Sequence, residues 1–197
     1  NRRHATLAPM DESRAIATAV VGYGFAGRSF HSYLVGLAAP ALALKGVVSS
    51  RPEARADITG RLGVHAWERF EDVLADEEVE LVVLATPNDV HAPQAIAALE
   101  AGKHVYCEKP IAGSYADGKA MLAASAEAGR MLHVQLARLY LDATLAAKKV
   151  IDAGELGKLY TARATEYRRR GRPYVDGYGT ARFVQREQSG GGALYDM

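Results

Sequence analysis

The stretch AIATAVVGYGFAG, residues 15–27, joins a short apolar run to three closely spaced glycines. The run from Ala15 to Val21 has the length and character of a buried strand, and a helix is predicted over residues 26–38. In the intervening G-x-G-x-x-G pattern, the first glycine permits a tight turn, the second lets the backbone approach a pyrophosphate, and the third allows close helix–strand packing. The pattern predicts dinucleotide binding; the alternative is a plain glycine turn. The expected contact residues are Gly22, Gly24, Phe25, Ala26 and Gly27.

The chain then alternates short apolar runs with longer amphipathic ones, as far as about residue 135. Further strands are predicted at residues 45–49, 64–65, 81–85, 104–107 and 131–135, with helices at 52–62, 70–75, 90–101 and 115–128. Strands joined by helices are typical of a doubly wound parallel sheet, so the predicted fold class is α/β.

The character of the sequence changes near Leu136. A helix is predicted at residues 142–153 and a long strand at 159–167, followed by a polar loop rich in glycine, arginine and tyrosine. We therefore expect a dinucleotide-binding Rossmann domain at residues 1–135. Residues 136–197 are expected to form an incomplete second domain, because they are too few for a core of their own. The chain begins without methionine and ends within a motif, so we expect it to be truncated.

Composition excludes several classes of protein. The chain has 197 residues, of which 49% are hydrophobic and 24% charged, which argues against disorder. Lys and Arg total 24 against 23 Asp and Glu, and this balance argues against a nucleic-acid binder. No apolar run approaches the ~20 residues that span a bilayer, and no signal peptide is evident. The single cysteine, Cys107, fits a reducing cytoplasm. Six histidines without metal-ligand spacing predict no metal site.

The end of the second predicted strand bears on the choice of cofactor. NAD specificity usually depends on a carboxylate about 20 residues after the glycines, where it bonds the ribose hydroxyls. Here the sequence reads Ser49-Ser50-Arg51-Pro52, with no carboxylate before Glu53. A hydroxyl and a guanidinium suit the 2′-phosphate of NADP. Ser50 and Arg51 therefore favour NADP over NAD, unless Arg51 is only a solvated charge at a helix start.

Two further motifs end the strands at residues 81–85 and 104–107. These are Thr86-Pro87-Asn88 and Glu108-Lys109-Pro110. Both are expected at the sheet edge where doubly wound folds bind ligands. On position alone, Asn88 is explained as the cap of the following helix in an ordinary turn, and a lysine placed like Lys109 is more often a solvated charge at a strand end. Pro110 restricts the backbone of Lys109, and the bond between them belongs to the class in which cis isomers occur.

Three stretches together resemble the Gfo/Idh/MocA family, the glucose–fructose oxidoreductase and inositol dehydrogenase-like enzymes. They are VVGYGFAGRSFH (20–31), LVVLATPNDVHAPQAIAALEAGKHVYCEKPIA (81–112) and GGGALYDM (190–197). The resemblance implies a Rossmann domain followed by an α/β domain with a mostly antiparallel sheet. It implies that Lys109 is catalytic and that Asp196 is the aspartate of the family's second motif, whose histidine would follow Met197. On the same resemblance, the cofactor contacts extend to Thr86, Pro87, Asn88, His91, Glu108 and Lys109, and the substrate contacts are Lys109, Arg138, Tyr167 and Asp196.

The activity implied is NAD(P)-dependent hydride transfer to or from a secondary alcohol or ketone. Lys109 would hydrogen-bond the reacting hydroxyl and Asp196 would orient the substrate. The segment Gln135-Leu136-Ala137-Arg138-Leu139 departs from the His-Asn-Arg-Arg-Trp of the inositol branch, so a sugar, glycoside or cyclitol remains open as the substrate. The full-length protein is expected to be a cytoplasmic homo-oligomer, either a dimer or a tetramer. The alternative is a regulator that binds a dinucleotide without turnover.

Overall fold

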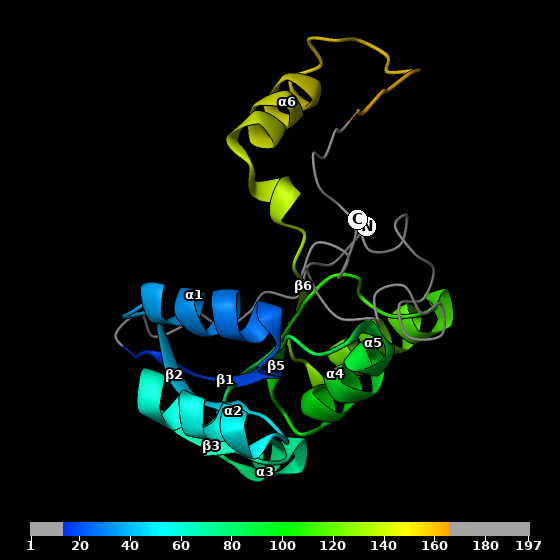
Figure 1. The fold of residues 1–197 in the computed structure, drawn as a ribbon. Coiled ribbons are helices and arrows are strands. Elements are labelled where there is room, and N and C mark those ends of the chain that lie inside the picture. Colours follow the sequence, from blue (N-terminus) through cyan, green and yellow to red (C-terminus); the bar gives the residue numbers. More distant parts are fainter. Residues whose placement is uncertain (1–13, 166–197) are drawn as a thin grey trace.

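The computed structural model describes residues 14–165, and its centre is a six-stranded parallel sheet (Figure 1). The strand order is β3-β2-β1-β4-β5-β6. This is the order of a dinucleotide-binding Rossmann fold, with the chain reversing direction across the sheet between β1 and β4. The strands are β1 Ile16–Val21, β2 Leu42–Val48, β3 His65–Trp67, β4 Leu81–Leu84, β5 His104–Cys107 and β6 Leu132–Val134.

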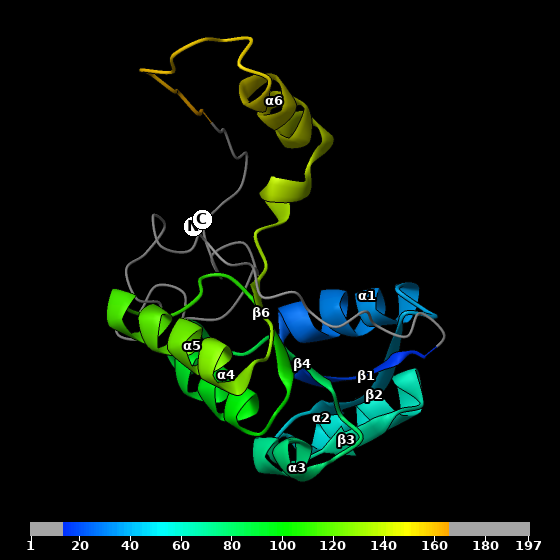
Figure 2. The same ribbon diagram turned by 180° about the vertical axis from the view of Figure 1, so that it is seen from behind.

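Helical segments cover the two faces of this sheet. One apolar core joins Val20, Val47 and Val83 of the strands to Val35 and Ile58 of the helices that follow β1 and β2. A second core lies on the opposite face, under the helices that follow β3, β4 and β5. In both views of the ribbon, α4 and α5 lie side by side (Figures 1 and 2). The helices are α1 Ser32–Leu37, α2 Pro52–Asp57, α3 Phe70–Ala75, α4 His91–Glu100, α5 Tyr115–Ala128 and α6 Asp142–Asp152; short turns of other helix types are η1 Gly27–His31, η2 Ile58–Leu62, η3 Asn88–Val90 and η4 Ala137–Tyr140.

Local sequence signals explain where several helices begin and end. Pro52 occupies the first turn of α2, where its missing N–H costs nothing. Ser114 caps α5 by accepting the backbone N–H of Asp117 at 3.1 Å, and Gly129 ends that helix in the left-handed conformation with φ of 61°. Asn88 does not cap the helix after β4 as expected: Pro87 and Val90 hold the cap positions of η3 and α4, and neither makes a side-chain cap bond.

The chain after β6 leaves the sheet. From residue 136 to residue 165 no side chain is buried, and α6 projects away from the layered part of the molecule (Figures 1 and 2). The strand predicted at residues 159–167 is wrong for the part that the structure describes, because residues 159–165 form no strand. A strand needs a neighbour to take up its backbone hydrogen bonds. Residues 14–165 place no neighbour there, and residues 166 and 167 lie outside the described range.

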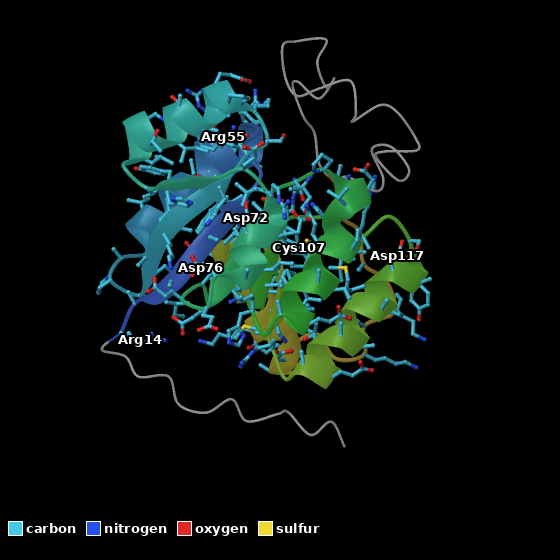
Figure 3. The ribbon with its side chains drawn as sticks, turned by 90° about the horizontal axis from the view of Figure 1, so that it is seen from below. Arg14, Arg55, Asp72, Asp76, Cys107 and Asp117 are labelled. Atoms are coloured by element: carbon cyan, nitrogen blue, oxygen red, sulfur yellow. The ribbon has the colours of Figure 1, made fainter. Side chains whose placement is uncertain are left out.

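The side chain of Cys107 is fully buried at the end of β5, amid the helices of one face (Figure 3). Burial, together with the charge of Glu108, raises the pKa of the thiol to about 12, so Cys107 is a neutral packing residue. Among residues 14–165, no helix is long and apolar enough to cross a bilayer. The same part of the chain brings together no group of three or more His, Cys, Asp or Glu side chains able to hold a metal ion.

The environment of His104 predicts that the stability of the β5–β6 edge depends on pH. Its Nδ1 accepts the backbone N–H of Met131 at 3.0 Å, which only an unprotonated nitrogen can do. Burial, and next the charge of Arg130, lower the pKa of His104 below 6.5. Unfolded chains therefore bind more protons, so we expect the free energy of unfolding to fall as pH drops from about 6.5 to the lowered pKa. Urea titrations at pH 7.5 and 5.5 measure this loss.

The matched variant is His104→Asn, whose amide oxygen can accept a hydrogen bond but does not titrate. The loss between the two pH values should be smaller in this variant than in the wild type. Carboxylates with lowered pKa values, such as Asp57 and Asp76, titrate below this window. An equal loss in both proteins would mean that His104 is not the group responsible.

Candidate dinucleotide and catalytic site

The glycine-rich turn lies at the carboxyl end of β1, beside the end of β4. Gly22 has φ of +98°, and a Cβ there would lie 2.7 Å from the carbonyl oxygen of Ala85. A Cβ on Gly27 would lie 1.9 Å from the carbonyl oxygen of Gly22. Both distances are far below contact, so packing alone requires glycine at these two positions.

Gly24 is different, because a Cβ there would meet nothing within 4 Å. Its backbone is exposed next to the first turn of the helix, where residues 25 and 26 continue into η1. Helix N-termini present N–H groups and positive dipole charge to anions. The open space over Gly24 leaves room for a pyrophosphate, the contact that we expect there from the sequence, and the close packing of Gly22 and Gly27 shapes the turn beneath it.

The turn after β2, together with α2, forms one wall of an open hollow of about 270 Å³. Ser49 is buried and accepts the backbone N–H of Arg51 at 3.4 Å. The Arg51 side chain is 59% exposed, and its guanidinium donates to the Tyr23 carbonyl at 3.2 Å and to Glu53 at 3.4 Å. A guanidinium has five N–H donors, more than these two contacts use. The hollow is lined by Tyr23, Arg28, Arg51, Glu53, Ala54 and Asp57.

A polar network in the wall of this hollow was not foreseen from the sequence. The buried Tyr23 donates its hydroxyl to Asp57 at 2.8 Å, and Arg28 donates to the same carboxylate oxygen at 3.0 Å. Arg61 donates to the Tyr23 hydroxyl at 2.6 Å. The hydrogen bonds from Tyr23 and Arg28 hold the pKa of Asp57 below its usual value, although desolvation opposes them. The network attaches α2 and η2 to the glycine-rich turn.

His91 connects the turn after β4 to the turn after β5. This side chain is fully buried, with Nδ1 2.8 Å from the Pro110 carbonyl oxygen and Nε2 2.9 Å from that of Thr86. The Thr86 hydroxyl in turn donates to Gln94 at 2.6 Å. His91 therefore lies behind the two turns and positions them, which differs from the direct cofactor contact expected from the sequence.

Glu108 and Lys109 directly follow β5. The Glu108 carboxylate accepts His31 Nε2 through one oxygen at 2.8 Å and the backbone N–H of Lys109 through the other at 3.0 Å. Burial favours the neutral acid, but these hydrogen bonds and the neighbouring positive charges lower the pKa of Glu108 overall. The Lys109–Pro110 bond is cis, and the Lys109 side chain is half-buried.

The other expected substrate residues are further along the chain. Arg138 lies on η4 just after β6, with its side chain exposed. Tyr167 and Asp196 lie outside the described residues. The structure thus brings the glycine turn, the β2 end, the β4 turn and the Lys109 turn to one edge of the sheet, because parallel strands all end on the same side.

This sheet order, with the glycine-rich turn at the point where the strand order reverses, defines a dinucleotide-binding Rossmann domain. The chain belongs to the Gfo/Idh/MocA oxidoreductase family. Residues 16–136 match the model described as "Oxidoreductase family, NAD-binding Rossmann fold", and residues 144–197 match the "GFO/IDH/MocA C-terminal domain". The family and the fold predicted from the sequence are confirmed.

Named relatives are dehydrogenases. The chain is 31% identical over 182 residues to scyllo-inositol 2-dehydrogenase (NADP(+)) IolW of Bacillus subtilis, covering 92% of this chain and 48% of that protein. It is 33% identical over 153 residues to levoglucosan dehydrogenase of Pseudarthrobacter phenanthrenivorans, and the match covers 74% of this chain and 39% of that protein. The chain also superposes on a crystal structure of the WlbA dehydrogenase from Bordetella pertussis in complex with NADH and UDP-GlcNAcA. The TM-score is 0.70 at 32% identity, and the match covers 75% of this chain and 45% of that one. The chain spans half or less of the length of these relatives.

Proposed function

We propose that the protein is an NAD(P)-dependent oxidoreductase acting on a secondary alcohol or ketone of a sugar, glycoside or cyclitol. The observation that carries the proposal is the position of Lys109, which follows β5 on the edge of the sheet that also holds the glycine-rich turn. Dehydrogenases of inositol and levoglucosan among the relatives support the substrate class. A screen of such polyols with the full-length protein, following the absorbance of the reduced cofactor, tests it.

The nicotinamide cofactor, when bound, supplies the hydride acceptor or donor. The chain's own part is to bind and orient both molecules and to move the proton of the hydroxyl. An amine can hydrogen-bond the reacting oxygen and exchange a proton with it, and Pro110 limits the backbone freedom of Lys109. We assign Lys109 and Asp196 the catalytic roles. Arg138 and Tyr167 are assigned to substrate binding together with them.

The domain boundary between residues 135 and 136 is part of the same proposal. It is supported by the end of β6 at Val134 and by the start of the second family match at residue 144. A homo-oligomer, either dimer or tetramer, and a cytoplasmic location are proposed for the full-length protein. Both rest on the family resemblance, and the second also on the single, buried cysteine. Size-exclusion chromatography with light scattering measures the oligomeric state.

We also propose that NADP is preferred over NAD, because Ser50 and Arg51 lie where a carboxylate would repel a 2′-phosphate. A charge-assisted hydrogen bond contributes ~1.5–3 kcal/mol, so NADP should bind roughly tenfold to hundredfold more tightly. Calorimetric titration of the full-length protein with both cofactors measures the ratio. In Arg51→Ala the NADP affinity should fall by most of that factor, while the NAD affinity changes little.

The matched control is Arg130→Ala, which removes the same charge from the loop between α5 and β6, before β6 begins and therefore at the opposite edge of the sheet. This variant should bind both cofactors like the wild type. Equal affinity for NAD and NADP, unchanged by Arg51→Ala, would make Arg51 a solvated surface charge and would return the preference to NAD.

A further inference from the structure

His31 lies at the end of η1, the helical turn that begins with the last glycine of the glycine-rich pattern. Only 5% of the residue is exposed, so the ring is enclosed by protein. Tyr106 of β5 packs edge-on against it, with ring centroids 5.9 Å apart. The hydroxyl of Ser32 donates to the Gly27 carbonyl at 2.7 Å and closes this turn of helix. The backbone that carries His31 is therefore fixed to the glycine-rich turn.

The partner of His31 comes from 77 residues further along the chain. His31 Nε2 lies 2.8 Å from Glu108 Oε1, and the Glu108 side chain is 21% exposed. A carboxylate only accepts hydrogen bonds, so the imidazole donates through Nε2. The second carboxylate oxygen, Oε2, accepts the backbone N–H of Lys109 at 3.0 Å. One carboxylate thus connects the helix after the glycine-rich turn to the backbone of the lysine.

We propose that His31 is a positioning residue: through Glu108 it holds the backbone of Lys109 in a fixed position relative to the glycine-rich turn. The inference rests on the proposed function, because it gives His31 a role only if Lys109 takes part in the reaction. A donor at Nε2 fixes the rotamer of Glu108, and Glu108 then fixes the peptide from which the lysine side chain extends. Misplacing a reacting group by about 1 Å can cost on the order of a hundredfold in rate.

The test compares variants that differ in the reach of their hydrogen-bond donor. His31→Gln places an amide N–H near the position of Nε2, whereas the shorter side chain of His31→Asn does not reach Glu108, and His31→Leu has no donor. In the full-length protein, the His31→Leu and His31→Asn substitutions should each lower kcat roughly tenfold to hundredfold. The Kd of these two variants for the cofactor should stay within a few-fold of wild type. The His31→Gln variant should keep most of the wild-type kcat. If the His31→Leu variant does not fold, comparing His31→Asn with His31→Gln tests the same point.

A second measurement does not depend on activity. Hydrogen exchange of the segment that contains the Lys109 amide should be faster in the Leu and Asn variants than in wild type, and close to wild type in Gln. The matched control is His104→Leu, which removes a histidine hydrogen bond at the start of β5. That variant should lose stability without a change in kcat or in exchange at Lys109.

Three results would overturn the inference. The first is a folded His31→Leu protein with wild-type kcat and wild-type exchange at Lys109. The second is an equal loss of kcat in the His31→Gln and His31→Leu variants, and the third is a loss confined to cofactor affinity, since either of these would separate the effect from the Nε2 hydrogen bond. If replacing Lys109 itself leaves turnover unchanged, the proposed function fails instead, so the two failures are distinguishable.

Discussion

Replacing Lys109 with methionine is expected to lower kcat by about 10²–10⁴-fold, the usual cost of removing a group that transfers a proton. Methionine keeps most of the volume of the lysine stem but has neither the charge nor the N–H donors. Our proposal assigns cofactor binding chiefly to the glycine-rich turn and to the residues that follow β2, so the Kd for NADP should stay within a few-fold of wild type. Steady-state kinetics and calorimetry on the full-length protein measure both quantities.

Lys109→Arg should not restore activity, because a guanidinium keeps its proton at neutral pH and differs in shape. The control is Lys119→Met on α5, which makes the same chemical change at an exposed position of a helix. It should behave like wild type. If Lys109→Met retains kcat within a few-fold, Lys109 is a solvated charge at a strand end. A wild-type protein that binds NADP but turns over no polyol would instead favour the regulator that binds a dinucleotide without catalysis.

The central strands were predictable from sequence because they are short, mostly apolar and bounded by glycine, proline or polar residues. Parallel strands covered on both faces need this composition, and residues 81–84 (LVVL) show it most clearly. The strand expected at residues 159–167 (LYTARATEY) mixes apolar and polar residues and has no neighbour among residues 14–165. Strand formation depends on a partner that local sequence does not specify, whereas the βα units of the first domain provide their own partners.

The site was predictable only where a motif carries the chemistry. The glycines, Ser50, Arg51 and Lys109 follow strands directly, so the position of a strand also gives the position of the residue. The pairs His31–Glu108 and Tyr23–Asp57 join residues 77 and 34 positions apart. No spacing in one sequence indicates such contacts, because they depend on how two crossovers bring separate turns together. His91 was expected to touch the cofactor, but its burial and its two carbonyl partners place it behind the turns.

Alanine at Gly27 and alanine at Gly24 should have opposite consequences, although both change the same motif. A Cβ on Gly27 would lie 1.9 Å from the Gly22 carbonyl oxygen, and this oxygen is backbone, so it cannot move away as the end of a flexible side chain could. We expect Gly27→Ala to lose about 3 kcal/mol or more of unfolding free energy, at the upper end of what overpacking costs. Urea denaturation measures this loss, and cofactor binding should be lost with it.

Gly24→Ala should leave the fold intact, because a Cβ there meets nothing within 4 Å and the backbone φ is not in the left-handed region. Its unfolding free energy should equal that of wild type or exceed it by up to ~1 kcal/mol, since alanine restricts the unfolded chain. The added methyl group would occupy the space into which the pyrophosphate must come, so the Kd for NADP should rise at least about tenfold, or ~1.4 kcal/mol.

The control for both variants is Gly36→Ala on α1, where a Cβ also meets nothing within 4 Å. It should keep the NADP affinity of wild type and gain a little stability, as expected for alanine in a helix. A Gly24→Ala protein that binds NADP with unchanged Kd would show that the cofactor does not approach this backbone. In that case Gly24 would be an ordinary turn residue, and only Gly22 and Gly27 would have a demonstrated need for glycine, a need that comes from packing and not from the cofactor.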